Sequence, residues 1–168
     1  RVWYGLPSSS FLVRRMLSYI DWHEVHTIVE LGGGYGNMTR EILKRKKPST
    51  TLRTCEREQE RFDILKTYST DTCTISHEDA LTCLQKMTDG SIDSIISTLP
   101  LWSIWHDMSS LILREVNRAL KKNGKFIQYQ YWLANKQDIA REMHLEKITW
   151  EPRNIGPAFI YIAWKKSV

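Results

Sequence analysis

The feature that most constrains the fold is the regular alternation of short apolar, β-branched segments with segments of helical length and pattern. A connection between parallel strands takes about a dozen residues and is usually helical, so this alternation predicts a doubly wound, Rossmann-like α/β sheet that is mostly parallel. The last two strands lack an intervening helix, so they are expected to form a hairpin with an antiparallel edge strand. The predicted strands are residues 27–31, 51–56, 73–76, 92–97, 125–131, 147–151 and 158–164, and the predicted helices are 11–20, 37–47, 59–68, 80–87, 108–120 and 135–143, the fifth ended by Gly124.

Length and composition set the size of the core. The chain has 168 residues, enough for one domain of ordinary size, and 42% of them are hydrophobic, too many for a disordered chain. Its longest apolar stretch, residues 158–164, is far shorter than the roughly 20 residues of a membrane-spanning helix. The chain begins with Arg1, which leaves open what precedes it.

Charge and cysteine content bear on partners and compartment. With 24 basic and 19 acidic residues the net charge is +5. A basic surface suits nucleic acid or anionic lipid, although many proteins of this charge bind neither. Three cysteines without a C-x-x-C pair predict neither a disulfide framework nor a zinc site, and no metal is expected. A reducing, cytoplasmic setting fits this cysteine usage.

The strongest local motif is the glycine-rich segment at residues 29–36, V-E-L-G-G-G-Y-G. It lies between a predicted strand and a predicted helix, where glycines allow positive φ angles and close approach of the backbone to a ligand. The alternative is a glycine turn without a ligand. The strand, the helix and Glu30 together favour nucleotide-type cofactor binding.

This motif resembles the first motif of S-adenosylmethionine-dependent methyltransferases, E/D-x-G-x-G-x-G, and the order of elements resembles the class I members of that family. The resemblance implies S-adenosylmethionine as cofactor, with Glu30 helping to seat its methionine end. It also implies a cofactor-binding loop that extends into the following helix. The implied contacts in this segment are Gly32, Gly33, Gly34, Gly36, Asn37 and Met38.

Acidic residues follow the next two predicted strands. Glu56, beside Arg57, ends the second strand about 20 residues after the glycines, where a carboxylate can accept both ribose hydroxyls. Asp79 and Ala80 follow the third strand, where they can contact an adenine amino group and ring nitrogen. The alternatives are a solvated charge for Glu56 and a helix cap for Asp79.

The fourth predicted strand ends in a candidate acceptor segment, Ser97, Thr98, Leu99, Pro100 and Leu101. Methyltransferases that act on nitrogen often carry a polar residue and a proline here. Backbone carbonyls and a side-chain oxygen then orient an amine lone pair for in-line attack on the methyl group. A strand that simply ends at proline is the alternative.

Three stretches together resemble the bacterial phospholipid N-methyltransferases, relatives of the ribosomal RNA adenine dimethyltransferases. Residues 7–9 are similar to the family's P-S-S. Residues 97–101 are similar to its S-G-L-P-L, with Thr98 replacing glycine. Residues 153–158 are similar to its R-N-x-P-P-A, with Gly156 replacing proline. The resemblance implies a phospholipid amine, such as that of phosphatidylethanolamine, as acceptor at an anionic membrane surface.

The resemblance also implies that residues 1–24 form a cap helix segment ahead of a methyltransferase domain at 25–168. The helix at 11–20 is then expected to lie on the membrane, although a helix that faces the core explains its pattern equally well. Candidate bases or orienting groups for a protonated amine are Tyr4, His106 and Asp107. Aromatic candidates for walls of an acceptor pocket are Trp102, Trp105 and Trp132.

Other functions fit the same fold, because fold does not determine substrate. An adenine N-methyltransferase on ribosomal RNA or DNA is the closest alternative. Its acceptor motif opens with Asn and carries an aromatic residue after the proline, where this chain has Ser97 and Leu101. A small-molecule or protein amine acceptor and an inactive module that binds S-adenosylmethionine complete the alternatives. The location is expected to be cytoplasmic or peripheral on the membrane, and the oligomeric state is open.

Overall fold

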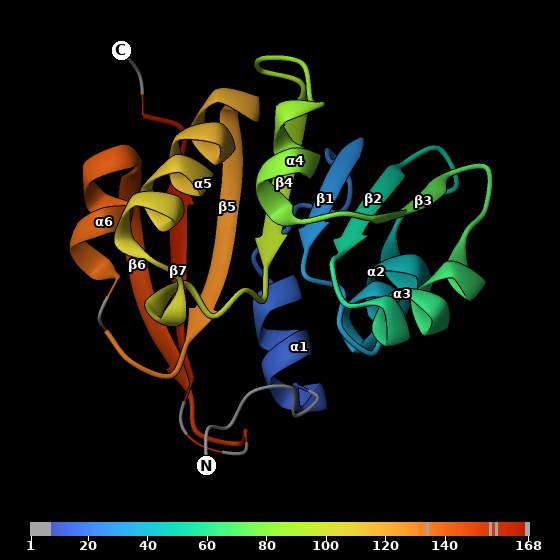
Figure 1. The fold of residues 1–168 in the computed structure, drawn as a ribbon, viewed down its shortest axis with the longest axis horizontal. Helices are drawn as coiled ribbons and strands as arrows, with labels where there is room; N and C mark the ends of the chain where they lie inside the picture. Colours follow the sequence, from blue (N-terminus) through green and yellow to red (C-terminus); the bar gives the residue numbers. More distant parts are fainter. Residues whose placement is uncertain (1–7, 134, 155, 157, 167–168) are drawn as a thin grey trace.

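A computed structural model describes residues 8–133, 135–154, 156 and 158–166, and shows a seven-stranded sheet between helices (Figure 1). The strands are β1 Thr27–Leu31, β2 Thr51–Glu56, β3 Cys73–His77, β4 Ile92–Ser97, β5 Leu120–Gln130, β6 His144–Glu151 and β7 Ala158–Trp164. The helices are α1 Ser10–Leu17, α2 Asn37–Arg45, α3 Gln59–Leu65, α4 Ala80–Gln85, α5 His106–Ala119 and α6 Lys136–Glu142, with 3₁₀ turns η1 Lys66–Tyr68 and η2 Leu101–Ser103.

The strand order confirms the predicted doubly wound sheet. The order is β3-β2-β1-β4-β5-β7-β6, and β3, β2, β1, β4 and β5 are parallel. The chain reverses its direction of winding between β1 and β4. In open α/β sheets the ligand crevice lies at this reversal, outside the carboxyl ends of the strands.

The terminal hairpin is present, but its antiparallel strand is not at the edge. Strand β7 pairs antiparallel with both β5 and β6, so β6 forms the edge. Residues of β7 are buried along most of its length, as an interior strand requires, whereas β6 is largely exposed or half-buried. Burial on both faces therefore explains the order of the two strands.

Gly124 does not end a helix, contrary to the sequence-based expectation. Helix α5 ends at Ala119, and β5 begins at Leu120 and contains Gly124. An added Cβ at Gly124 would lie 2.9 Å from the Ile92 carbonyl oxygen. The glycine is therefore required by the close approach of β5 to β4, where the pairing register is irregular.

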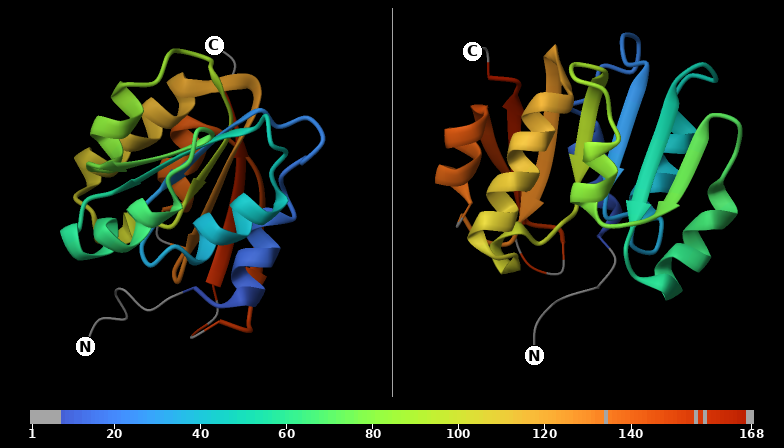
Figure 2. Two further views of the ribbon diagram at one scale, coloured as in Figure 1. Left: turned by 90° about the vertical axis from the view of Figure 1, so that its right-hand side faces the viewer. Right: turned by 45° about the horizontal axis from the view of Figure 1, so that its top comes forward.

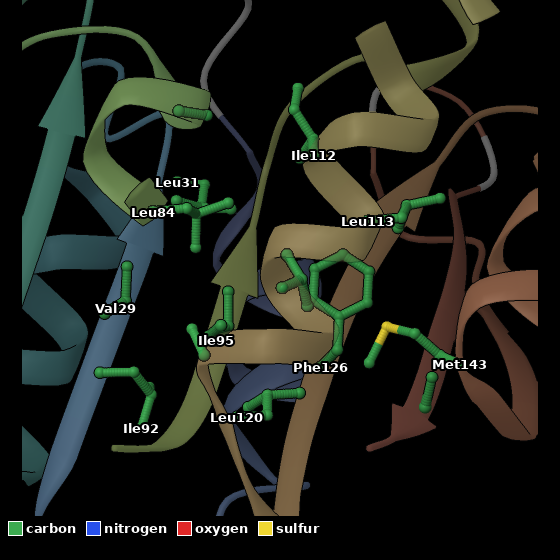
Figure 3. Close-up of a cluster of buried hydrophobic side chains, with 14 of the residues drawn as sticks. Val29, Leu31, Leu84, Ile92, Ile95, Ile112, Leu113, Leu120, Phe126 and Met143 are labelled. Atoms are coloured by element: carbon green, nitrogen blue, oxygen red, sulfur yellow. The ribbon is translucent and has the colours of Figure 1, made fainter. Parts of the chain in front are cut away.

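The core has two layers, one on each face of the sheet, and the edge-on view in Figure 2 separates α1 and α2 from α4 and α5. The layer in Figure 3 packs β-strand residues such as Val29, Ile95 and Phe126 against Leu84 of α4 and Leu113 of α5. The opposite layer contains α1 and α2. In the described part of the chain, no helix is long and apolar enough to cross a membrane.

Helix α1 contributes to this opposite layer. Its apolar residues Leu12, Val13, Met16 and Leu17 are almost fully buried, while the arginines on its other face are exposed. Ser9 caps the helix, since its hydroxyl accepts a hydrogen bond from the Leu12 amide at 3.2 Å. The sequence analysis left open whether this helix lies on the membrane or faces the core, and in the structure its apolar side faces the core.

Candidate functional site

The glycine-rich loop joins β1 to α2 at the reversal point of the sheet. Gly32, Gly34 and Gly36 have φ angles of 81°, 54° and 83°, and no described residue other than glycine has a positive φ. The amides of Gly32 and Gly33 both donate to the Cys55 carbonyl of β2 at 3.1 Å. No atom of the described residues lies within 4 Å of a Cβ built on Gly34, so the loop faces open space within that part of the chain.

Glu56 fixes a carboxylate beside this open position. It ends β2 and is 5% exposed. Its Oε2 accepts a hydrogen bond from the Gly34 amide at 2.8 Å, and its Oε1 accepts one from the Glu58 amide at 2.9 Å. Each carboxylate oxygen keeps a second lone pair, so the group can accept two further hydroxyl donors.

Glu30 lies fully buried on β1, beneath the loop. Its Oε2 accepts hydrogen bonds from the Thr39 hydroxyl at 2.7 Å and the Thr54 hydroxyl at 2.8 Å. Its Oε1 has no donor among the described residues. Burial, opposed by these two hydrogen bonds, raises the pKa of Glu30 from 4.5 to about 7. The carboxyl group therefore has unused capacity to bind a donor group.

Asp79 and Ala80 lie at the start of α4. Asp79 caps this helix, accepting hydrogen bonds from the Thr82 amide at 3.0 Å and the Thr82 hydroxyl at 2.7 Å. The Glu78 amide donates to the Glu56 carbonyl at 3.2 Å, which places this turn beside the end of β2. Asp79 therefore caps the helix. Its carboxylate keeps free lone pairs, so a contact with adenine stays a prediction.

The candidate acceptor segment lies directly against the glycine loop. The Thr98 amide donates to the Leu31 carbonyl at 3.1 Å, and the Thr98 hydroxyl donates to the Gly32 carbonyl at 2.5 Å. The Leu99 side chain would lie 3.0 Å from a Cβ at Gly32. Ser97 is buried at the end of β4, and its hydroxyl accepts a hydrogen bond from the Leu99 amide at 3.3 Å.

Two glutamines that the sequence analysis did not single out reach the same segment. Gln128 and Gln130 of β5 are 0% and 1% exposed, and both side-chain amides donate to the Leu99 carbonyl, at 2.9 and 3.1 Å. Their i, i+2 spacing places them on one face of the strand. Two amides at alternate positions, directly after the apolar pair Phe126 and Ile127, are the sequence signal that could have identified them.

The two terminal stretches that carry the resemblance also meet. The Ser9 amide donates to Asn154 Oδ1 at 3.0 Å, and the Ser9 hydroxyl donates to the Arg153 carbonyl at 2.8 Å. The Arg153 guanidinium lies 4.4 Å from the centre of the Phe11 ring. These contacts hold the start of α1 against the β6–β7 connection, whereas Pro7, Ile155 and Pro157 lie outside the described residues.

The side chains of the other predicted cofactor contacts, Asn37, Met38 and Arg57, are buried in the core, bonded to another residue or exposed. The Met38 side chain is buried in the core layer of α1 and α2, so it faces the protein interior. The Asn37 side chain donates to the Ser8 carbonyl at 3.2 Å. Arg57 is exposed and pairs with Glu58 at 3.4 Å. A cofactor contact from Met38 would therefore have to come from its backbone, and one from Arg57 would come from an exposed side chain.

The predicted bases and aromatic walls are mostly exposed. His106 and Asp107 begin α5, and the His106 ring lies 3.6 Å from Asp138 of α6. Trp105 is 87% exposed and Trp132 is 64% exposed, so neither is enclosed in a pocket wall. Trp102 is half-buried. Tyr4 lies outside the described residues.

The residues around the loop fit an adenosine-type cofactor. They offer a glycine bend facing open space, a fixed carboxylate with free lone pairs at Glu56, and an unpaired carboxyl oxygen at Glu30. The three cysteines are buried and free. Within the described ranges, no three side chains of His, Cys, Asp or Glu are grouped as metal ligands would be.

The sequence is similar to a family of known proteins and to a curated relative. Residues 29–128, more than half of the chain, match the family described as Methyltransferase domain. The ornithine lipid N-methyltransferase of Singulisphaera acidiphila is 29% identical over 163 residues, which cover 92% of this chain and 84% of that protein.

Solved structures share the fold. A SAM-dependent methyltransferase from Aquifex aeolicus has a TM-score of 0.74 at 11% identity, with 93% of this chain and 90% of that chain covered. The 1,6-didemethyltoxoflavin-N1-methyltransferase of Burkholderia thailandensis, solved with bound 1,6-didemethyltoxoflavin and S-adenosylhomocysteine, has a TM-score of 0.73 at 12% identity, with 92% of this chain and 78% of that chain covered. At such low identities these likenesses show the fold alone.

Proposed function

Because the chain belongs to the Methyltransferase domain family, whose members depend on S-adenosylmethionine, we propose that it methylates the amine of a membrane lipid. The observation that carries the proposal is the 2.5 Å hydrogen bond from Thr98 to the Gly32 carbonyl, which joins the acceptor segment to the glycine loop. The choice of a lipid is supported by the 29% identical relative, which is an ornithine lipid N-methyltransferase. A phospholipid such as phosphatidylethanolamine presents a comparable amine.

The glycine loop and the neighbouring strand ends would hold the cofactor. The loop at Gly32, Gly34 and Gly36 would line it, Glu56 would accept from its ribose hydroxyls, and Asp79 with the Ala80 amide would contact its adenine. Glu30 would receive a donor from the methionine end, directly or through water. S-adenosylmethionine, when bound, supplies an electrophilic methyl group on a positively charged sulfur.

The acceptor segment would orient the amine. Ser97, Thr98, Leu99 and Pro100 form the wall next to the loop, and methyl transfer needs mainly alignment and exclusion of water. A lipid ammonium must lose a proton before it attacks, and His106 is the imidazole nearest in sequence to this wall. We assign His106, with Asp107 and Tyr4 as alternatives, the role of receiving this proton.

The carboxyl edge of the sheet would face the lipid surface. Large apolar side chains are exposed at this edge: Phe11 at 43%, Trp105 at 87% and Trp132 at 64%. Tryptophan rings favour the boundary between lipid head groups and acyl chains. Arg14 and Arg15 of α1 are exposed, and the net charge of +5 favours an anionic surface.

One assay tests the acceptor. The protein is given S-adenosylmethionine with a labelled methyl group and, in parallel, vesicles of phosphatidylethanolamine, vesicles of ornithine lipid, structured RNA, DNA and free amines. Label in either lipid alone would support the proposal, and the two vesicle types would identify the head group. Label in nucleic acid alone would overturn it. Tight cofactor binding without label in any acceptor would indicate an inactive binding module.

A further inference from the structure

Three donors converge on the carbonyl oxygen of Leu99. The Leu101 amide donates to it at 2.9 Å, across Pro100, whose φ and ψ of −76° and 70° are those of an inverse γ-turn. The side-chain amides of Gln128 and Gln130 donate at 2.9 and 3.1 Å. A carbonyl oxygen has two lone pairs, so this atom has no capacity left for a substrate N–H.

The two glutamines are held in a costly environment. Both side chains are buried, and their Oε1 atoms have no donor among the described residues. Gln128 makes a second hydrogen bond, from its side-chain amide to the Tyr129 carbonyl at 2.6 Å. A buried amide oxygen without a partner lowers stability, and an apolar side chain would fill the same space without that cost. The glutamines therefore do not serve stability alone.

The Thr98–Leu99 pair is consequently fixed from two sides. Thr98 forms hydrogen bonds with Leu31 of β1 and with Gly32 of the glycine loop. The Leu99 carbonyl accepts hydrogen bonds from the two glutamines of β5. The distance between acceptor wall and glycine loop is thus set by groups on β1 and on β5. A misplacement of about 1 Å at a reacting centre is enough to slow a reaction about 100-fold.

We propose that Gln128 and Gln130 are positioning residues for methyl transfer, which lock the Leu99 carbonyl as a structural anchor and so fix the acceptor wall at its distance from the glycine loop. The inference rests on the proposed function, because it takes residues 97–101 as the wall that orients the acceptor. Because the Leu99 carbonyl is fully occupied, other oxygen atoms would have to orient the amine.

Methionine substitutions test the role, since methionine has similar length and no N–H donor. The variants are Gln128→Met, Gln130→Met and the double variant, and the control is Gln137→Met at an exposed position on α6. We measure kcat and KM with lipid vesicles and the Kd for S-adenosylhomocysteine by calorimetry. The double variant is expected to lose about 10- to 100-fold in kcat while its Kd stays within about twofold. Each single variant should lose less, because one glutamine still holds the carbonyl.

A glutamate at position 130 gives a second readout, measured only over the pH range in which denaturant unfolding shows the variant to be folded. In Gln130→Glu the protonated carboxyl group can donate to the Leu99 carbonyl, whereas the ionised group cannot and repels it. The kcat of this variant should therefore fall with rising pH more steeply than that of the wild type. A purely structural role predicts parallel profiles, and parallel profiles would overturn the inference.

The outcomes separate the inference from the proposed function. If the wild-type protein methylates no lipid, the proposed function fails. If the wild type is active and the double variant matches it, the positioning role fails. A double variant that loses kcat and S-adenosylhomocysteine binding together would also refute the role, since it would show a general disturbance of the site.

Discussion

The Glu56 carboxylate accepts a hydrogen bond from the Gly34 amide, with 2.8 Å between Oε2 and the amide nitrogen. This contact joins the end of β2 to the open bend of the glycine loop. A Glu56→Gln variant would turn an amide N–H group toward the Gly34 or Glu58 amide and lose one acceptor for the ribose. We expect its affinity for S-adenosylhomocysteine to fall about 10- to 100-fold, the loss typical of hydrogen bonds to a charged group. Calorimetry with Glu58→Gln, an exposed neighbour, is the control.

Gly34→Ala separates ligand binding from backbone strain. A Cβ at Gly34 meets no atom within 4 Å in the part of the chain that the structure describes, but the φ of 54° costs an alanine about 1–2 kcal/mol. Gly90→Ala has the same cost at a φ of 61°, in a turn remote from the loop. Both variants should unfold at similarly lowered denaturant concentrations, and only Gly34→Ala should lose S-adenosylhomocysteine binding. Equal binding by the two variants would contradict the location of the cofactor.

The buried Glu30 predicts a pH dependence of stability. Burial raises its pKa in the folded protein from 4.5 to about 7, so the folded state holds a proton that the unfolded chain has released between these values. The free energy of unfolding should therefore fall as pH rises from about 4.5 to 7, by a contribution of about 3 kcal/mol, and change little above. Denaturant unfolding of Glu30→Gln should show a flatter profile in this range. Glu60→Gln, at an exposed position on α3, is the matched control.

Asn154 is expected to anchor α1. Its side chain accepts from the Ser9 amide at 3.0 Å and donates to the Tyr131 hydroxyl at 3.2 Å. Asn154→Ala should lower the free energy of unfolding by about 1–2 kcal/mol, since two part-buried hydrogen bonds are lost. Asn123→Ala, at an exposed position of β5, should change it little. A variant as stable as the wild type would show that these contacts do not hold the helix.

Four strands agree with the sequence-based prediction from end to end: 27–31, 51–56, 92–97 and 158–164. Their β-branched, apolar residues are bounded by glycine, proline or polar residues, so local pattern defines both ends. The start of β5 was not predictable in this way. Its polar residues 121–124 resemble a turn, and they lie in β5 between Leu120 and Lys125, which pair with Ile92 and Ser94 of β4.

The parts of the candidate site that the sequence predicts are those in which the backbone conformation requires a particular residue type. The glycines of the loop require positive φ angles, and Glu56 lies where a strand must end beside them. The partners of Glu30 and the convergence of Gln128 and Gln130 on Leu99 join residues from different strands. Contacts of this kind depend on tertiary packing, which the sequence pattern does not specify.

The central claim is that the glycine loop and Glu56 together bind an adenosine-type methyl donor. Calorimetric titration of the folded wild-type protein with S-adenosylmethionine and S-adenosylhomocysteine tests it most directly. The structure predicts saturable binding of both at one site per chain, weakened in Glu56→Gln and Gly34→Ala. Absence of binding heat at several temperatures, from protein whose circular dichroism shows it to be folded, would contradict it.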